Sequence, residues 1–218
     1  GIVTDTITKP NAEELKQIIA ETRGLLKLMT IAPEIDGNEE AFRHLLQNNI
    51  VPCFGHSNAE ITNVYNAPGN KVNITHLFNA MSGVSHKTSG LAMLPFLDDE
   101  LFFELNGDGV HVNDETLQIC YKHLNHDRLI LISDAVTSAG LEPGEHEYYG
   151  QTIISGNRGV RYKENDVLMG SNLLMNDVFK RFLKLTGAPL YEGIRFASYN
   201  PCHLLGISDK KGSIAVGK

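Results

Sequence analysis

The sequence has 218 residues, of which 42% are hydrophobic and 21% charged, a composition that predicts one globular domain with one sizeable core. A net charge of -7 argues against the broad basic surface that binds nucleic acid or anionic membranes. No apolar run approaches the roughly 20 residues of a membrane span and no signal peptide opens the chain, so we expect a cytoplasmic protein with a small-molecule partner.

The first 132 residues alternate between apolar runs and helical patterns. Asn11, Asn38 and Asn113 each precede a segment with helical spacing of apolar residues, which predicts helix starts at these positions. Apolar, β-branched runs predict strands over residues 25–31, 50–54, 72–75, 101–105 and 129–132. This alternation predicts successive βα units.

The second part of the chain departs from that pattern. Residues from about 144 to 167 have aromatic and β-branched residues separated by Gly and Asn, which predicts a β-hairpin excursion. Helical periodicity returns between Leu173 and Leu183. Asn200 and Pro201 predict the cap and first turn of a last short helix.

Two architectures place strands and helices in this alternation, a (β/α)8 barrel and a doubly wound open sheet. The first strand is not followed by a glycine-rich phosphate-binding turn, so a dinucleotide-binding sheet has less support.

The three cysteines, Cys53, Cys120 and Cys202, are far apart and odd in number, and we expect them to be reduced residues of the core.

Polar or titratable residues follow four of the predicted strands. His56, His76, Asp108 with His111, and Asp134 each come shortly after a strand ends. Any one such histidine is more often an ordinary hydrogen-bonded loop residue. Barrel enzymes place their active sites at the carboxyl ends of the strands, and four coincidences in register predict a site there.

His56 and His76 follow neighbouring strands, so their imidazole nitrogens can bind one metal ion. A third ligand would complete a hydrolytic site in which the ion lowers the pKa of its water from about 15.7 toward about 7. Asp134 could then accept a proton from the metal-bound water and return it to a leaving amine.

Several motifs occur in an order typical of one enzyme family. The sequence resembles the N-acetylglucosamine-6-phosphate deacetylases over essentially its whole length, and the segment around His76 is the most distinctive part. The motifs that carry the resemblance are Thr30–Glu34 (TIAPE), Gly55–Ala59 (GHSNA), Thr75–Met81 (THLFNAM), Asp108–His111 (DGVH), Ser133–Ala135 (SDA), Gly170–Ser171, Asn200–Gly206 and Lys211–Ile214.

The resemblance implies an α/β fold, a partial (β/α)8 barrel of the metal-dependent hydrolase kind, with residues 1–218 as one incomplete amidohydrolase domain. It implies hydrolysis of the N-acetyl amide of N-acetylglucosamine 6-phosphate to glucosamine 6-phosphate and acetate. A divalent metal is expected, zinc first, with iron or manganese as alternatives, in a homodimer. The implied roles are metal binding by His56 and His76, base and acid catalysis by Asp134, and substrate binding by Asn79, Ala80, Lys87, His111, Leu168, Met169 and Gly170.

The sequence departs from the family pattern at three places. Family members carry a His-Leu-Glu-Gly-Pro segment whose glutamate is the third metal ligand, and the 218 residues contain no such segment. Lys87 stands where the family has a phosphate-binding arginine, often contributed across the dimer, and lysine lacks the bidentate fork. Met169 stands where alanine is usual.

These departures keep two further readings open. The first is a truncated, non-catalytic protein of the same fold, and the second is an amidohydrolase with a different amide substrate. Asn79 and Ala80 beside Met81, together with the basic Lys87, favour a phosphorylated sugar. Because the glutamate ligand is missing from the 218 residues, we expect this chain by itself to bind metal weakly and to show little or no deacetylase activity.

Overall fold

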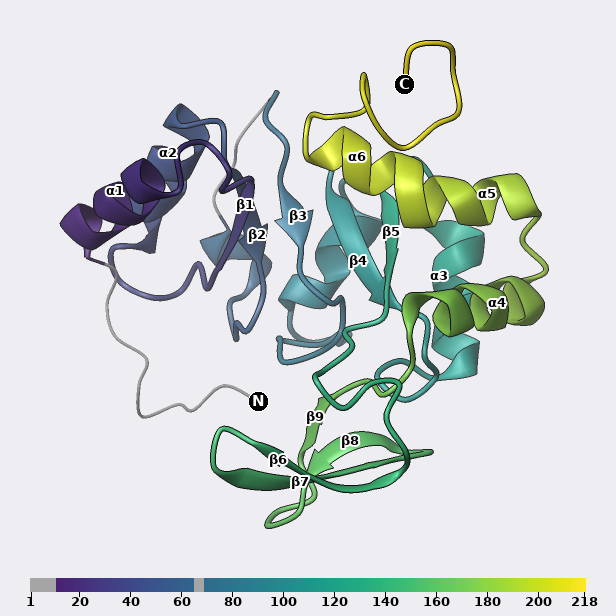
Figure 1. Cartoon of the computed structure of the whole chain (residues 1–218). Coiled ribbons are helices and arrows are strands. Elements are labelled where there is room, and N and C mark those ends of the chain that lie inside the picture. Colours follow the sequence, from purple (N-terminus) through teal and green to yellow (C-terminus); the bar gives the residue numbers. More distant parts are fainter. Residues whose placement is uncertain (1–10, 65–68) are drawn as a thin grey trace.

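A five-stranded parallel sheet forms the centre of the protein in the computed structural model, which describes residues 11–64 and 69–218 (Figure 1). Residues 1–10 and 65–68 of the expected domain lie outside the described residues. The strands pair in the order in which they occur in the sequence. They are β1 (Leu28–Ile31), β2 (Val51–Phe54), β3 (Asn73–Ile74), β4 (Phe102–Asn106) and β5 (Leu129–Ile132).

Each predicted apolar run overlaps one of these strands, although the first strand is shorter than expected. The prediction began it at Leu25, whereas β1 begins at Leu28. Arg23 and Gly24 have φ angles of 50° and 79° and turn the chain after the first helix, and Leu25 is 83% exposed. The beginning of the apolar run therefore follows the turn and is not part of the strand.

The helices α1 (Ala12–Glu21) and α3 (Asp114–His123) begin as the sequence predicts. Asn11 Oδ1 accepts hydrogen bonds from the backbone N–H groups of Glu13 and Glu14 at 3.0 and 3.3 Å. Asn113 Oδ1 accepts one from Thr116 at 2.9 Å. These contacts satisfy N–H groups that a helix start leaves without intrahelical partners.

The prediction that Asn38 caps the helix α2 (Asn38–Gln47) is wrong. Gly37 is the cap residue, with a φ of 88°, and Asn38 is the first residue of the helix. Its Nδ2 donates a 2.6 Å hydrogen bond to the carbonyl oxygen of Ala32, so this amide holds the loop after β1.

The strand order argues against a doubly wound sheet. A doubly wound sheet reverses its strand order at one point, because its connections cover both faces. The five described strands run in uniform order, and right-handed crossovers then place their connections on one face. Of these connections, β1–β2 and β4–β5 contain α2 and α3, whereas β2–β3 and β3–β4 contain the 3-10 turns Ile61–Asn63 and Leu91–Phe96.

Both faces of the sheet are buried, as expected for parallel strands. On the helix side, Phe54, Ile74, Phe103, Leu105 and Leu129 pack in one cluster with residues of α2, α3 and the later helices. On the opposite face, the apolar cluster is smaller and consists of Val51, Cys53, Phe102, Ile130 and Leu204. In β4, Glu104 and Asn106 continue the side of Phe102, so polar groups replace apolar ones toward the carboxyl end of this face.

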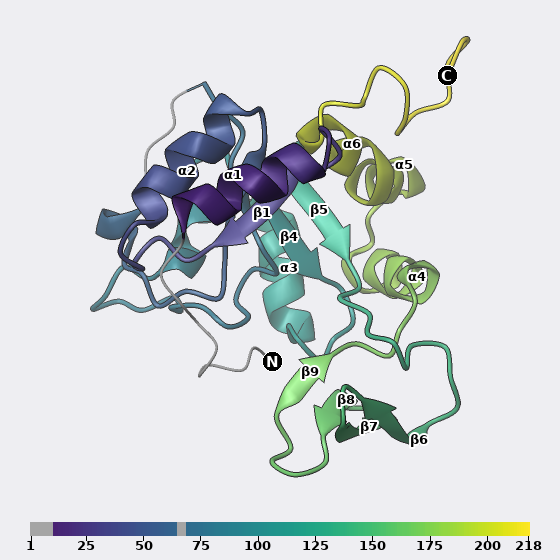
Figure 2. The same cartoon turned by 60° about the vertical axis from the view of Figure 1, so that its left-hand side comes forward.

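The expected excursion is a four-stranded antiparallel sheet. Figures 1 and 2 show this sheet beside the end of the molecule toward which β4 and β5 run. Its last strand includes Leu168, Met169 and Gly170. Leu168 and Gly170 pair with Arg161 and Val160 of β8, and the register shifts between these two pairs. The strands are β6 (Gly144–Tyr148), β7 (Gln151–Gly156), β8 (Gly159–Tyr162) and β9 (Leu168–Gly170).

The chain ends in α4 (Met175–Thr186) and a helical segment that begins earlier than expected. The prediction placed a helix start at Asn200, but α5 (Leu190–Ile194), a π-helical turn (Arg195–Tyr199) and α6 (Asn200–Leu204) follow one another directly. Asn200 already has helical φ and ψ angles of -61° and -45°. The change in hydrogen-bond register before Pro201 allows a residue without an N–H group to lie inside the helix.

In the described part of the chain, none of the helices is long and apolar enough to cross a membrane.

The cysteines give a direct test of this fold. Burial raises the pKa of the Cys53 and Cys120 thiols to about 12, and a thiol of that pKa holds almost no reactive thiolate at pH 8. Cys202 is only partly buried. We expect a thiol reagent at pH 8 to modify no cysteine other than Cys202 in the native chain, and all three after denaturation. Rapid labelling of Cys53 or Cys120 in the native chain would contradict the packing described above.

Candidate active site

His56 and His76 meet at the carboxyl ends of β2 and β3. Their Nε2 atoms are 2.8 Å apart, and their ring centroids are 4.6 Å apart. Two nitrogens bound to one zinc ion lie no more than about 4.2 Å apart, since each zinc–nitrogen bond is about 2.0–2.1 Å. The two rings are therefore close enough to share one ion.

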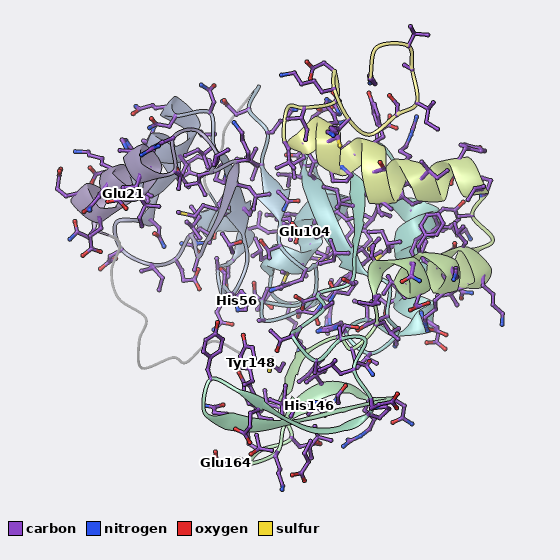
Figure 3. The ribbon with its side chains drawn as sticks, viewed as in Figure 1. Glu21, His56, Glu104, His146, Tyr148 and Glu164 are labelled. Atoms are coloured by element: carbon purple, nitrogen blue, oxygen red, sulfur yellow. The ribbon has the colours of Figure 1, made fainter. Side chains whose placement is uncertain are left out.

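The pKa of His56 also suits metal binding. Burial, followed by the neighbouring His76 ring, lowers the pKa of His56, which favours the neutral imidazole that binds metals. His76 is 8% exposed and its Nδ1 is buried with no hydrogen-bond partner among the described residues. Figure 3 labels His56 at the edge of the parallel sheet that faces the small antiparallel sheet.

The partly buried carboxylate of Glu104, on β4, contacts the residues around His76. Glu104 Oε2 accepts a 3.2 Å hydrogen bond from the backbone N–H of His76, and Glu104 Oε1 accepts one from Asn73 Nδ2 at 2.8 Å. Burial raises the pKa of Glu104 despite these two hydrogen bonds. The same group thus fixes the ends of β3 and β4 relative to each other.

Asp134 follows β5 and faces His111. Asp134 Oδ2 lies 3.3 Å from His111 Nε2, and the Asp134 side chain keeps 38% of its surface exposed. On its other side, His111 Nδ1 is 2.7 Å from Asp108 Oδ2. A partly exposed carboxylate held by a buried imidazole is able to exchange protons with a bound molecule.

Unusual backbone conformations mark the second residue after the end of three strands. His56, His76 and Asp134 have φ angles of 47°, 32° and 51°, in the left-handed region that non-glycine residues rarely adopt. Each such residue costs of order 1–3 kcal/mol and persists where the surroundings impose it, often at functional sites. This agreement among the three residues was not visible in the sequence.

The loop after β3 lies directly against the loop after β2. The backbone N–H of Ser57 donates to the carbonyl oxygen of Ala80 at 3.0 Å, which brings Ala80 next to the residue that follows His56. Asn79 Nδ2 donates to the carbonyl oxygens of His76 and Leu77 at 3.2 and 3.1 Å. Asn79 and Ala80 are therefore part of the same end of the sheet as the histidines.

The segment from Leu168 to Gly170 also reaches this end of the sheet. The N–H of Ser171 donates to the carbonyl oxygen of Asp134 at 2.8 Å, so Gly170 lies beside the residue proposed as the base. A Cβ atom on Gly170 would lie 2.9 Å from that carbonyl oxygen and 2.5 Å from Val136 Cγ1, so a side chain does not fit. Leu168 and Met169 are half-buried on β9.

Lys87 has no contact with the other proposed site residues among the described residues. It lies on the exposed segment 83–89, where its backbone N–H donates to Ser85 Oγ at 3.1 Å.

The described residues supply two nitrogen donors for a metal ion but not a complete set. Within residues 11–64 and 69–218, no group of three or more His, Cys, Asp or Glu side chains is placed to hold an ion. Glu34 is engaged elsewhere: its carboxylate accepts hydrogen bonds from Ser57 Oγ and from the N–H of Asn58, both at 2.6 Å. It shapes the loop after His56 and does not complete the histidine pair.

A cavity of about 280 Å³ lies at the opposite end of the sheet, near Val51 and Leu204. Its lining includes Lys27 and Lys71 but none of the proposed site residues. The candidate site is therefore argued from its titratable groups and not from the volume of this cavity.

Two supporting carboxylates received no role from the sequence. Glu104 is the single charged residue in the apolar run 101–105, and a charge at an inward position of a buried strand is a signal that could have identified it. Asp108 was noticed as part of a motif, but its contact with His111 depends on the loop conformation. Hydrogen bonds to backbone N–H groups, such as that of His76, have no sequence signature.

Comparisons with known proteins identify the family of this chain. Residues 8–218 match the sequence profile described as the Amidohydrolase family. The chain is 31% identical over 224 residues to an N-acetylglucosamine-6-phosphate deacetylase of Caenorhabditis elegans, covering 98% of this chain and 52% of the relative. It is 31% identical over 208 residues to an N-acetylgalactosamine-6-phosphate deacetylase of Escherichia coli O157:H7, covering 94% and 54%.

Solved structures give the same result. A crystal structure of N-acetylglucosamine-6-phosphate deacetylase from Thermotoga maritima superposes with a TM-score of 0.84 at 30% identity, covering 98% of this chain and 57% of that one. A mutant of the Mycobacterium smegmatis enzyme in complex with N-acetyl-D-glucosamine-6-phosphate gives a TM-score of 0.82 at 27% identity, covering 92% and 54%. The chain spans about half the length of the relatives that it matches.

Proposed function

The chain belongs to the amidohydrolase family, and from this membership we propose that it contributes the catalytic end of an N-acetylglucosamine-6-phosphate deacetylase. The observation that carries the proposal is the close approach of His56 Nε2 to His76 Nε2, with Asp134 held by His111 at the end of β5. The reaction is hydrolysis of the N-acetyl amide to glucosamine 6-phosphate and acetate.

We further propose that the parallel sheet is part of a (β/α)8 barrel and that residues 1–218 form one incomplete domain of it. The uniform strand order supports this, because it is the order in which a barrel is built. The small sheet β6–β9 is then an excursion between two βα units.

His56 and His76 would hold a divalent ion, and the lowered pKa of His56, caused by burial and by His76, keeps a ring in the neutral form that binds metal. Amidohydrolases generally use a divalent metal ion, with zinc our first choice and iron or manganese as alternatives. Such an ion supplies Lewis acidity, which makes water a stronger nucleophile at neutral pH. Nitrogen ligands suit zinc and iron.

Asp134 acts as base and then as acid. Its partly exposed carboxylate accepts a proton from the attacking water and gives the proton to the amine nitrogen as the amide bond breaks. We assign binding of the sugar to side chains at the same end of the sheet, namely His111, Asn79, Ala80 and the segment from Leu168 to Gly170. Lys87, exposed on its loop, would reach the phosphate of a substrate bound to a second subunit of a homodimer.

Acetate release from matched substrates tests the proposal. We expect the longest polypeptide that the coding region supplies to release acetate from N-acetylglucosamine 6-phosphate and much less from N-acetylglucosamine, which lacks the phosphate. N-Acetylgalactosamine 6-phosphate is the alternative substrate, because the Escherichia coli relative carries that name. Equal rates with and without the phosphate would contradict a phosphorylated substrate, and no release from any of the three would contradict the deacetylase.

Single histidine substitutions test the metal site separately. Loss of a residue that only hydrogen-bonds to a metal ligand weakens metal binding by about 10–100-fold. His56→Ala or His76→Ala removes a ligand itself, so each should weaken zinc binding by more than that. His123→Ala, at the exposed end of α3, removes a histidine away from the pair and serves as the control. Isothermal titration with zinc measures all three, and equal affinity in the His76 variant would remove the proposed site.

A further inference from the structure

A row of three neighbouring side chains runs from the surface into the loop after β4. Asp134 Oδ2 lies 3.3 Å from His111 Nε2, and His111 Nδ1 lies 2.7 Å from Asp108 Oδ2. Side-chain exposure falls along the row, from 38% for Asp134 to 5% for His111 and 1% for Asp108. Asp108 is sealed from solvent at the inner end.

The environment of Asp108 keeps it ionised. Burial raises its pKa, but the hydrogen bonds from the His111 ring and from the N–H groups of Val110 and His111 outweigh burial and lower the pKa below its usual value. The two backbone bonds, at 2.9 and 3.0 Å, go to Oδ1, which leaves Oδ2 for the ring. An ionised carboxylate accepts hydrogen bonds and donates none, so His111 Nδ1 carries the proton.

The loop that carries this row is held in place from the other side. Arg181 Nη1 donates to the carbonyl oxygen of Gly107 at 3.1 Å, and its Nη2 pairs with Asp114. Gly109 has a φ of 76°, and a Cβ atom there would overlap the Arg181 guanidinium. The loop therefore packs closely against Arg181, on the side away from the contacts of the His111 ring.

We propose that Asp108 is a positioning residue, which fixes His111 with Nδ1 protonated and Nε2 directed at Asp134. Nε2 is then an acceptor, and it holds the carboxyl proton of Asp134 after Asp134 has taken that proton from water. The inference rests on the proposed function, which assigns Asp134 to the reaction. In that reaction Asp134 takes one proton from water and returns it to the leaving amine nitrogen. Asp108 gains and loses no proton, and acts through the His111 ring.

Asp108→Asn tests this role because the change is nearly isosteric. The amide oxygen can still accept from Val110 and His111, while the amide Nδ2 faces His111 Nδ1 as a donor and forces the ring into the Nε2-protonated form. In the serine protease triad the same change leaves the geometry intact and costs about 10⁴-fold in kcat through the wrong tautomer. We expect kcat to fall by roughly 10²–10⁴-fold here, with a smaller change in KM.

The decisive measurements are ¹⁵N NMR of the His111 ring and steady-state kinetics on the longest polypeptide that the coding region supplies. Asp114→Asn is the matched control, because it weakens the Arg181 contact on the same loop and leaves the His111 ring contacts in place. We expect it to keep both the tautomer and kcat.

An unchanged His111 tautomer in Asp108→Asn would overturn the proposal, as would an equal loss of kcat in the Asp114→Asn control. A changed tautomer with normal kcat would overturn the role in the reaction. If the protein without substitutions released no acetate, the proposed function would fail. A changed His111 tautomer in Asp108→Asn would still support the positioning of His111, and an unchanged tautomer would still overturn it.

Discussion

Asp134→Asn is expected to reduce kcat by roughly 10²–10⁴-fold, the range for loss of one general acid–base group, while substrate still binds. The amide has nearly the same shape as the carboxylate but cannot accept a proton from water at neutral pH. Because Asp134 is used twice, first as base and then as acid, the loss should lie toward the upper end. The test measures acetate release together with the affinity for N-acetylglucosamine 6-phosphate.

Asp99→Asn provides the control for this experiment, since it makes the same chemical change at an exposed position before β4. It should leave kcat unchanged. An Asp134→Asn variant with nearly normal turnover would show that another group moves the proton. A variant that lost substrate affinity in parallel with kcat would assign Asp134 to binding instead of to catalysis.

Local sequence patterns predicted the elements of this fold because each pattern has a short-range physical cause. The apolar run 129–132 became β5, and Asn113 capped α3, since burial and capping depend on neighbouring residues. The continuous helical segment from Leu190 to Leu204 was missed because Asn200 and Pro201 also suit a helix start. A proline fits inside this helix because the hydrogen-bond register changes before Pro201, and that change has no sequence signal.

The candidate site was predictable as a set of residue types at strand ends, but its support was not. His56 and His76 could be paired from the sequence, because adjacent parallel strands end at the same edge. The contact of Glu104 with the backbone of His76, and the left-handed backbone of both histidines, depend on how loops close over the sheet. Such contacts join residues far apart in the chain and leave no periodic pattern.

The 218-residue chain by itself is expected to bind zinc weakly and to release little or no acetate from N-acetylglucosamine 6-phosphate. Two neutral imidazoles leave the charge of the ion uncompensated, and the described residues bring no third ligand to His56 and His76. The nearby carboxylates have other partners: Glu34 binds Ser57 and Asn58, and Glu104 binds Asn73 and the His76 backbone. An ill-positioned nucleophile loses further rate, since a displacement of about 1 Å can cost on the order of 100-fold.

Titration of this chain with zinc, and an acetate assay with added zinc, iron or manganese, measure both expectations. The full-length Thermotoga maritima deacetylase, of which this chain covers 57%, is the positive control. Zinc affinity and turnover equal to those of the control would mean that a carboxylate within residues 1–218 completes the site. Glu34→Gln and Glu104→Gln would then identify that carboxylate. The variant that removes the ligand should lose as much zinc affinity as His76→Ala, and the other variant should not.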